Sequence, residues 1–401
     1  MYADPPAEFS RIIATSPTAG KMPLQACFAA SAMPVGCVRM ALAKVRWHDS
    51  NMLPHLESSG DLQMCTQGRF RRTMVPLASN LLLALGLSGC GSAGTVSSAP
   101  PQPIPPAAAT RLVGYLPDYD GSYATFASTL EFKQMTHLML AFGLPPACNG
   151  TCTAQSDMTF ALNQTDTDIA ALVDAAHAAG VKVMLSIGGG DNASDALIAQ
   201  FYNAGLSSQL AASLDSYLAA HNLDGADVDI EDPSIMGPNY EAFVKALITR
   251  LHGEGKIVTA AVAEWLQTQN VMSNATLHEF DFVNVMVYSN LSDCQTALAY
   301  FSSIGEPASQ MTLGVPFFGQ NADGSIAETY ATILAAYPNA WQSDEVSGGT
   351  LDKGVTLNYV GEATMAQETL LGKQNGGVMI WELSQDAQPP HSLLNVIQKN
   401  L

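Results

Sequence analysis

Positive charge is scarce in this chain of 401 residues, which holds 17 Lys and Arg against 36 Asp and Glu. Residues 1–89 hold 8 Lys and Arg against 5 Asp and Glu, whereas residues 90–401 hold 9 against 31, a net charge of −22. A body this acidic repels phosphate backbones and anionic membrane surfaces. Nucleic acid and lipid headgroups are therefore excluded as partners, and neutral or cationic ligands stay open.

Long hydrophobic runs are also missing. The apolar stretch 74–87 has about 14 residues, whereas a membrane-spanning helix needs about 20. It follows the basic cluster 69–72 and precedes small residues, which is the order of a secretory signal. The run Leu87-Ser88-Gly89-Cys90 resembles the lipobox of bacterial lipoproteins, which implies acylation of Cys90 after cleavage. We expect an exported lipoprotein, on the periplasmic or cell-surface side of a membrane and bound to it only through the lipid, or otherwise a secreted protein.

The composition divides the chain into four parts. Residues 1–63 lack periodicity and precede Met64, which can serve as an initiator, so they are interpreted as an extension that is disordered or not translated. Residues 64–89 are the signal peptide with its lipobox. Residues 90–110 are rich in Pro, Ser and Ala and predict an extended spacer. The remaining residues, 111–401, are predicted to form a single domain.

Cysteine is rare in that domain. Cys148 and Cys152 stand close together and can close a small disulfide loop in an oxidising compartment. The distant Cys294 then stays a free, buried thiol. Metal binding by two cysteines without nearby His is the poorer alternative.

Short apolar runs alternate with segments of helical periodicity from residue 111 onward. Because parallel strands need a crossover, and the crossover is usually a helix, this alternation predicts a parallel sheet. Eight units over about 290 residues match a closed (β/α)₈ TIM barrel, in which catalytic groups lie at the carboxyl ends of the strands. The expected strands are 112–116, 136–142, 182–187, 225–231, 257–263, 282–288, 312–317 and 378–383. The expected helices include 168–179, 195–220, 240–252, 291–303, 364–371 and 392–399.

The fourth run carries three alternating carboxylates. Since side chains alternate faces along a strand, Asp227, Asp229 and Glu231 project to one side, with alternate Cα atoms under about 7 Å apart. Carboxylates this close cannot all be ionised, so at least one keeps its proton near neutral pH. A proton on Glu231, at the strand end, suits a general acid. Clustered carboxylates also bind divalent cations, so from the residues alone a metal site stays equally open. We call these three residues the carboxylate ladder.

The pattern Asp-Gly-x-Asp-x-Asp-x-Glu over 224–231 resembles a signature motif of family 18 glycoside hydrolases, the chitinases and endo-β-N-acetylglucosaminidases. The end of the third run resembles a second signature motif of the family. Two further positions, at the ends of the sixth and eighth runs, also agree with the family's pattern. The residues that carry these likenesses are Ser186, Gly188, Gly189, Met286, Tyr288 and Trp381.

The resemblance implies a retaining mechanism in which the substrate's own 2-acetamido group is the nucleophile. Glu231 would protonate the glycosidic oxygen and later activate water. Asp229 would orient the acetamido group, Asp227 would share a proton behind it, and Tyr288 would bind the acetamido oxygen. No cofactor and no metal is implied.

The resemblance also implies residues that bind the sugar. Trp381 would offer its face to the sugar beside the cleaved bond, with Met286, Ser186, Gly188 and Gly189 close by. Tyr115 and Trp265, at the ends of the first and fifth runs, are candidate sugar-stacking residues. The expected partner is a β-linked N-acetylglucosamine oligo- or polysaccharide, and we expect a monomer.

The chain departs from the family's pattern at several points. Ile230 stands where the family frequently has Trp, and Ser289 stands where it often has Asp, which leaves the substrate open. The short stretch between Phe317 and Trp381 predicts a barrel without a large α+β insertion. The open cleft that follows favours internal cleavage or branched glycans over processive digestion from a chain end. A non-catalytic lectin on the same barrel and a metal-dependent barrel enzyme are the alternatives.

Overall fold

The computed structural model describes residues 43–44, 57–58, 110–133, 135–148, 152, 158–351 and 353–401. The chain divides into two compact units, Met1–Ala99 and Pro100–Leu401. In the first unit, the described residues form two strands that pair antiparallel, β1 (Ala43–Lys44) and β2 (Glu57–Ser58). The predicted signal peptide, Cys90, the spacer up to residue 109 and most of the predicted extension lie outside the described residues.

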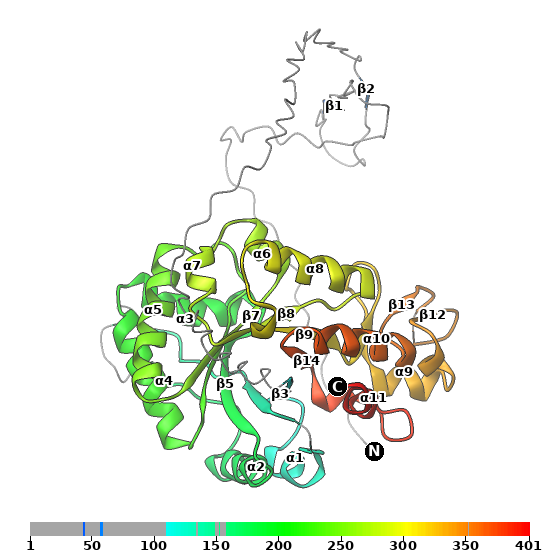
Figure 1. Ribbon diagram of the computed structural model, residues 1–401, viewed down its shortest axis with the longest axis horizontal. Coiled ribbons are helices and arrows are strands. Elements are labelled where there is room, and N and C mark those ends of the chain that lie inside the picture. Colours follow the sequence, from blue (N-terminus) through cyan, green and yellow to red (C-terminus); the bar gives the residue numbers. More distant parts are fainter. Residues whose placement is uncertain are drawn as a thin grey trace, which may run out of the picture. The chain divides into compact units, whose positions relative to one another are not determined.

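Eight parallel strands close a barrel in the second unit, in the order β14-β3-β4-β5-β6-β7-β8-β9. Each predicted run overlaps one of them, with ends that differ by up to two residues, so the prediction of a (β/α)₈ barrel is confirmed. Figure 1 shows the helices arranged around these strands. The strands are β3 (Arg111–Pro117), β4 (His137–Ala141), β5 (Lys182–Gly188), β6 (Gly225–Asp229), β7 (Ile257–Val262), β8 (Phe282–Met286), β9 (Met311–Pro316) and β14 (Gly377–Trp381).

Most helices begin at a side chain that accepts a hydrogen bond from the first turn. Thr165 accepts from the N–H of Asp168, and Asn290 accepts from the N–H groups of Ser292 and Asp293. The helices are α1 (Tyr123–Thr129), α2 (Asp166–Ala178), α3 (Asn192–Asn203), α4 (Ser207–Ala220), α5 (Pro238–Gly253), α6 (Glu264–Thr268), α7 (Asn274–Leu277), α8 (Leu291–Ser303), α9 (Tyr330–Ala336), α10 (Glu362–Lys373) and α11 (Leu393–Asn400).

The single helix predicted over 195–220 is wrong, because the chain forms α3 and α4 there. Gly205 adopts φ +77° between them, and its N–H donates to the carbonyl of Tyr202, which ends the first helix. Helices α1, α6, α7 and α9 were not among the expected elements, and all four are short.

The core has two parts, which follow from the alternation of side chains along the strands. Residues such as Leu112, Val228 and Val285 face outward and pack under the helices. A smaller cluster of Val113, Tyr115, Met139, Ala141, Met184, Phe282 and Met379 forms a separate group. Because these residues alternate with the outward-facing ones, they fill the barrel interior and leave its upper end to polar groups.

A small insertion lies between β9 and β14. It holds α9 and a four-stranded antiparallel sheet in the order β11-β10-β13-β12. The strands are only two or three residues long: β10 (Phe318–Gln320), β11 (Ala327–Thr329), β12 (Glu345–Val346) and β13 (Leu357–Asn358). The insertion is small, in line with the expected absence of a large α+β domain.

Cys148 and Cys152 form a disulfide in the loop that follows β4. Gln200 on α3 holds this loop, because its Oε1 accepts from the N–H of Cys148 at 2.9 Å and its Nε2 donates to the carbonyl of Pro146 at 3.0 Å. Cys294 is a free, buried thiol on α8.

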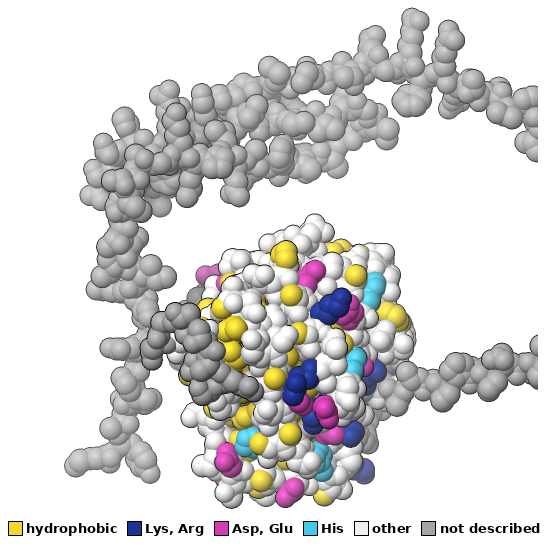
Figure 2. All heavy atoms as spheres, turned by 90° about the vertical axis from the view of Figure 1, so that its left-hand side faces the viewer, with side chains coloured by type: hydrophobic (Ala, Val, Ile, Leu, Met, Phe, Trp, Pro, Cys, Tyr) yellow, Lys and Arg dark blue, Asp and Glu magenta, His cyan; other side chains and the backbone are white. Residues whose placement is uncertain are grey.

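Charged side chains of both signs are sparse on the face shown in Figure 2, and some of the basic ones lie beside acidic ones. Among the described residues, Arg250 pairs with Asp215 at 2.9 Å and Lys182 with Asp224 at 2.6 Å. Within the described ranges, no helix combines the length and the apolar character needed to cross a bilayer.

Candidate active site

The carboxylate ladder begins inside the barrel and ends at its rim. Asp227 and Asp229 lie on β6 and point inward, whereas Val228 between them faces the outer core. Strand β6 ends at Asp229, so Glu231 lies two residues beyond the strand. The three carboxylates therefore share one side, and their exposure rises from Asp227 (0%) through Asp229 (4%) to the half-buried Glu231.

Asp227 is held by donors from four strands. Its Oδ2 accepts the hydroxyls of Tyr115 and Ser186, both at 2.7 Å. Its Oδ1 accepts the hydroxyl of Thr259 at 2.6 Å and the amide of Asn284 at 3.3 Å. Burial raises the pKa of Asp227, and the four donors oppose that rise by stabilising the charge. This carboxylate is rigidly placed and does not reach the cleft.

Asp229 has a different environment. Its Oδ1 is buried and has no hydrogen-bond partner among the described residues. Burial first, and then the charges of Glu231, Asp227 and Asp195, raise the pKa of Asp229 well above its usual value. These surroundings disfavour the charged form of Asp229 while the cleft is empty, and its oxygen without a partner is able to bind a group that enters the cleft.

Glu231 stands at the edge of the cleft. Burial, and then the charge of Asp195, raise its pKa to about 7. A carboxyl with this pKa is protonated in about half of the molecules at neutral pH, which suits a group that first gives and then takes a proton.

The cleft beside Glu231 has a volume of about 570 Å³. Trp265, which is 46% exposed, lines it from α6, and Tyr288 and Met286 line it from the end of β8. Burial and the charges of Asp229, Glu231 and Asp227 raise the pKa of Tyr288 well above its usual value, so its hydroxyl keeps its proton. The hydroxyl donates to the sulfur of Met379 at 3.9 Å, a weak acceptor, and is able to bind a ligand.

A smaller hollow of about 270 Å³ adjoins this cleft and shares Tyr288, Ser289 and Gln320 with it. Gln320 belongs to β10, so the small insertion forms part of the cleft wall. Ser289 donates its hydroxyl to Asp293 on α8 at 2.8 Å. A carboxylate is therefore present near the position where the expected Asp is replaced by Ser289.

Trp381 ends β14 and packs on the interior cluster. Its ring stacks on Phe142 with centroids 5.6 Å apart and lies 5.7 Å from the ring of Tyr115. Its side chain is only partly exposed, and it lies at the carboxyl end of its barrel strand. This placement fits the expected floor position.

Tyr115 and Ser186 differ from what we expected of them. Tyr115 is 1% exposed and Ser186 is fully buried, so neither presents a surface to a sugar. The reason is the charge of Asp227, which draws both hydroxyls inward. In this structure they hold Asp227 and do not contact the cleft, so the expected sugar stacking on Tyr115 is corrected.

Gly188 and Gly189 lie where the chain passes close to its neighbours. A Cβ on Gly188 would stand 2.1 Å from the carbonyl oxygen of Asp229, and one on Gly189 would stand 2.5 Å from the ring of Phe142. The N–H of Gly189 donates to that same carbonyl of Asp229 at 2.7 Å. The two glycines therefore allow β5 and β6 to approach at the ladder.

Sequence reasoning missed several residues that shape the site. Asn284 lies two residues before Met286 on β8 and thus on the same face, a register that alternation alone indicates. Thr259 is found by the same argument on β7. Gly190 and Asp195 contact Glu231 and follow the third barrel strand, β5. Apart from the extra glycine, nothing in the sequence indicates their place in the site.

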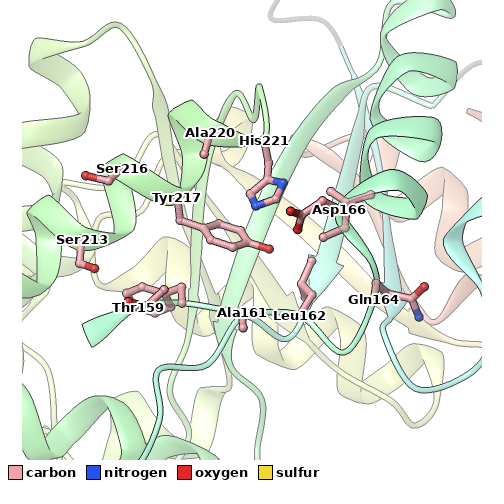
Figure 3. A pocket seen from close by; sticks show the side chains of 12 residues that line it. Thr159, Ala161, Leu162, Gln164, Asp166, Ser213, Ser216, Tyr217, Ala220 and His221 are labelled. Carbon is pink, nitrogen blue, oxygen red and sulfur yellow. The ribbon is translucent and has the colours of Figure 1, made fainter. Parts of the chain in front are cut away.

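Another hollow, of about 630 Å³, lies between α2, α4 and the segment 159–164 (Figure 3). In Figure 3 His221 and Asp166 point toward one another, and Tyr217 packs on His221 with centroids 4.3 Å apart. The hollow is larger than the cleft, but no ladder carboxylate lines it. We place the candidate site at the ladder, where perturbed carboxyls meet an open cleft.

The described residues contain no group of three or more His, Cys, Asp and Glu side chains arranged to hold a metal ion.

Comparison with known proteins agrees with this geometry. The profile of a family described as glycosyl hydrolases family 18 matches residues 111–386. The chitinase ChiB of Flavobacterium johnsoniae, also of that family, is 25% identical, with a TM-score of 0.62 over 73% of this chain and 93% of the other. No curated protein matches the sequence.

Two plant structures share the fold. A class V chitinase mutant of Cycas revoluta in complex with (GlcNAc)₃ is 20% identical, with a TM-score of 0.59 over 72% of this chain and 99% of the other. The chitinase-like agglutinin of Robinia pseudoacacia is 20% identical, with a TM-score of 0.56 over 72% and 98%. At this identity the likeness shows the fold alone, since one relative is named an enzyme and the other an agglutinin.

Proposed function

The chain belongs to family 18 of the glycosyl hydrolases, and on this premise we propose that it cleaves β-1,4-linked N-acetylglucosamine with retention of configuration. The observation that carries the proposal is the pair of Glu231 and Asp229: one carboxyl with a pKa of about 7 at a cleft, and beside it a buried carboxyl with a free oxygen. The orienting group then ends the strand, and the acid stands two residues beyond it.

The first step breaks the glycosidic bond. Glu231 gives its proton to the glycosidic oxygen while the carbonyl oxygen of the substrate's 2-acetamido group bonds to the anomeric carbon. The products of this step are the free alcohol and a cyclic oxazolinium ion. No carboxylate nucleophile is needed, because the substrate supplies the attacking oxygen.

The second step reverses the proton transfer. Glu231, now a carboxylate, takes a proton from water while the water oxygen bonds to the anomeric carbon and the oxazolinium ring opens. Two displacements at the same carbon give retention.

The neighbouring groups stabilise the oxazolinium ion. Asp229 binds the acetamido N–H and balances the positive charge, and the hydroxyl of Tyr288 binds the acetamido oxygen. Asp227 is fixed by its four donors and holds Asp229 in place by sharing its proton. The open face of Trp381 carries the sugar next to the cleaved bond.

Trp265 and the open cleft support internal cleavage of a chain. Its exposed ring can stack on a sugar beyond the cleaved bond, and the small insertion leaves the ends of the cleft free. We propose chitin and chitooligosaccharides as substrates, with the N-glycan core as the second candidate.

The variant Glu231→Gln tests the proposal. We expect it to lose most of its turnover on chitotetraose and on a high-mannose glycopeptide, while substrate binding is kept. Glu254→Gln, an exposed residue at the end of α5, is the matched control. Unchanged turnover in Glu231→Gln would refute the assignment, and the substrate that is cleaved separates chitin from N-glycan.

A lectin on the same barrel is the alternative, and the agglutinin named above keeps it open. The complete ladder favours the enzyme, since binding alone needs no general acid. Binding without hydrolysis across chitin, chitosan, peptidoglycan and glycoprotein would establish the lectin instead.

Export with a lipid anchor at Cys90 is a separate proposal, supported by the sequence 69–90. Cells fed a labelled lipid precursor should label the wild-type protein and not Cys90→Ala. We also propose a monomer, which light scattering of the purified domain will test.

A further inference from the structure

A buried carboxylate on α3 holds the backbone that carries Glu231. Oδ2 of Asp195 accepts the N–H of Glu231 at 2.8 Å and the N–H of Asp232 at 2.9 Å. The strand β6 ends at Asp229, so these two N–H groups lie beyond the last residue of the strand. Asp195 is fully buried, which makes it part of the wall behind the cleft.

The surroundings of Asp195 contain acids and phenols. The groups that interact with its charge are Asp191 just before α3, Tyr202 on α3, Asp229, Glu231 and Asp232 on or just after β6, and Tyr240 on α5. None of these groups is basic. Oδ1 of Asp195 is buried and has no hydrogen-bond partner in the part of the chain that the structure describes.

Hydrogen bonding alone does not explain a carboxylate here. The Oδ1 of an asparagine would accept the same two N–H groups and would avoid the cost of a buried charge without a counter-ion. A reason for the charge of Asp195 is its effect on Glu231, the nearest group that titrates during the proposed reaction.

We propose that Asp195 is a positioning residue of this reaction, which fixes the backbone at Glu231 and whose negative charge keeps the Glu231 carboxyl protonated until the substrate takes the proton. The inference rests on the proposed function and names a residue of the same site.

The effect of the charge has the sign that the reaction requires. A negative charge nearby disfavours a second one, so Asp195 adds to burial in raising the pKa of Glu231 to about 7. After the proton has left, the same repulsion makes the Glu231 carboxylate a stronger base toward water. Burial raises the pKa of Asp195 itself, whereas its two N–H donors stabilise its charge.

The variant Asp195→Asn separates the charge from the hydrogen bonds. The pH dependence of kcat/KM on chitotetraose should keep its shape, with its basic limb moved to lower pH. Asp191→Asn is the matched control: Asp191 caps α3 through the N–H of Ala193 at 3.2 Å, is exposed, and does not contact Glu231. The basic limb of the pH profile of Asp191→Asn should lie at the same pH as that of the wild type.

The variant Asp195→Ala removes both hydrogen bonds. We expect kcat to fall roughly tenfold to a hundredfold, the size of effect that a small misplacement of a catalytic group produces, with little change in KM. Circular dichroism and thermal melting of each variant report whether it is folded. If Asp195→Asn does not fold, Asp195→Glu is tested in its place. This variant keeps the negative charge, so the basic limb of the pH profile should lie at the wild-type pH while kcat falls.

An unmoved basic limb in folded Asp195→Asn, or a limb that moves in Asp195→Glu, would overturn the role of the charge. Neither result touches the proposed function. That function fails on another observation, retained turnover in Glu231→Gln, so the two failures are distinguishable.

Discussion

Asp227, Asp229 and Glu231 share one side of β6 and the segment just after it, yet each has a different set of partners. Asp227 accepts four hydrogen bonds, Asp229 has a buried oxygen with none among the described residues, and Glu231 faces the cleft. Carboxyl groups at a spacing of two therefore have three different environments, because the neighbouring strands contribute hydrogen-bond donors to Asp227 and, among the described residues, none to Oδ1 of Asp229.

The pH dependence of the wild-type enzyme follows from Glu231. Its pKa of about 7 means that the general acid loses its proton as the pH rises through neutrality. We expect kcat/KM on chitotetraose to fall above about pH 7, by up to tenfold for each further pH unit. A rate that stays level to about pH 9 would show that Glu231 is not the acid.

The ladder was predictable because the alternation of side chains along a strand is a local property. The roles of Tyr115 and Asp195 were not, because they depend on contacts across the barrel. Tyr115 meets Asp227 over a separation of 112 residues, and Asp195 meets Glu231 from a helix. The sequence places an aromatic residue at a strand end and therefore near the site, but it does not show which way the hydroxyl of that residue points.

At the scale of the element, the loop after β5 places glycines next to the carboxyl of Glu231. Gly190 adopts φ +67°, and a Cβ there would stand 2.5 Å from Oε1 of Glu231. This approach explains why a third glycine follows the two of the motif. The loop leaves no room for a side chain between β5 and Glu231.

The variant Gly190→Ala should therefore lose activity. The new methyl group displaces the carboxyl of Glu231, and we expect at least a tenfold loss of kcat. Gly205→Ala is the matched control, since Gly205 has φ +77° and nothing within 4 Å of its Cβ position. Both variants carry a backbone penalty of about 1 kcal/mol, so equal losses of kcat in the two would contradict the contact with Glu231.

A second carboxyl with a shifted pKa lies between helices, away from the cleft. Glu368 on α10 is fully buried near the thiol of Cys294 on α8, and burial raises its pKa to about 8. The folded protein holds a proton that the unfolded chain releases at an ordinary pKa of 4.5. The stabilisation from this group is thus complete below pH 4.5 and is lost as the pH rises through 8.

The variant Glu368→Gln should remove this dependence. Between about pH 5 and pH 8 the wild type loses up to about 1.4 kcal/mol of stability per pH unit through this carboxyl, and the variant does not. Melting temperatures of both proteins across this range, with Glu254→Gln as a surface control, test the expectation. Parallel curves for all three would contradict it.

The elements differ in how far the sequence predicts them. The barrel strands are buried on both faces and alternate with helical segments, so all eight were predicted. The sheet β11-β10-β13-β12 has strands of two or three residues, too short for any periodicity to show. The break between α3 and α4 lies at one glycine inside a stretch whose apolar pattern continues on both sides.

At the scale of the whole molecule, the count of strands predicted closure into a barrel, because eight parallel strands with helices outside leave no sheet edge. The composition predicted an acidic body, with a net charge of −22 over residues 90–401. The cleft carries part of that charge, since Glu231, Glu264 and Asp293 all line it. A cationic polysaccharide is therefore attracted to the surface that holds the catalytic carboxyl.

Partly deacetylated chitin carries ammonium groups and tests this attraction. The sugar whose bond is cleaved must keep its acetyl group, because that group is the nucleophile, whereas its neighbours are free to be glucosamine. We expect kcat/KM on partly deacetylated oligomers to fall several-fold between about 20 mM and 500 mM NaCl, as salt shortens the range of the field. Fully acetylated oligomers of the same length are neutral, so their kcat/KM should change less than about twofold. An equal response of the two substrates to salt would show that the charge of the body serves solubility and has no part in substrate capture.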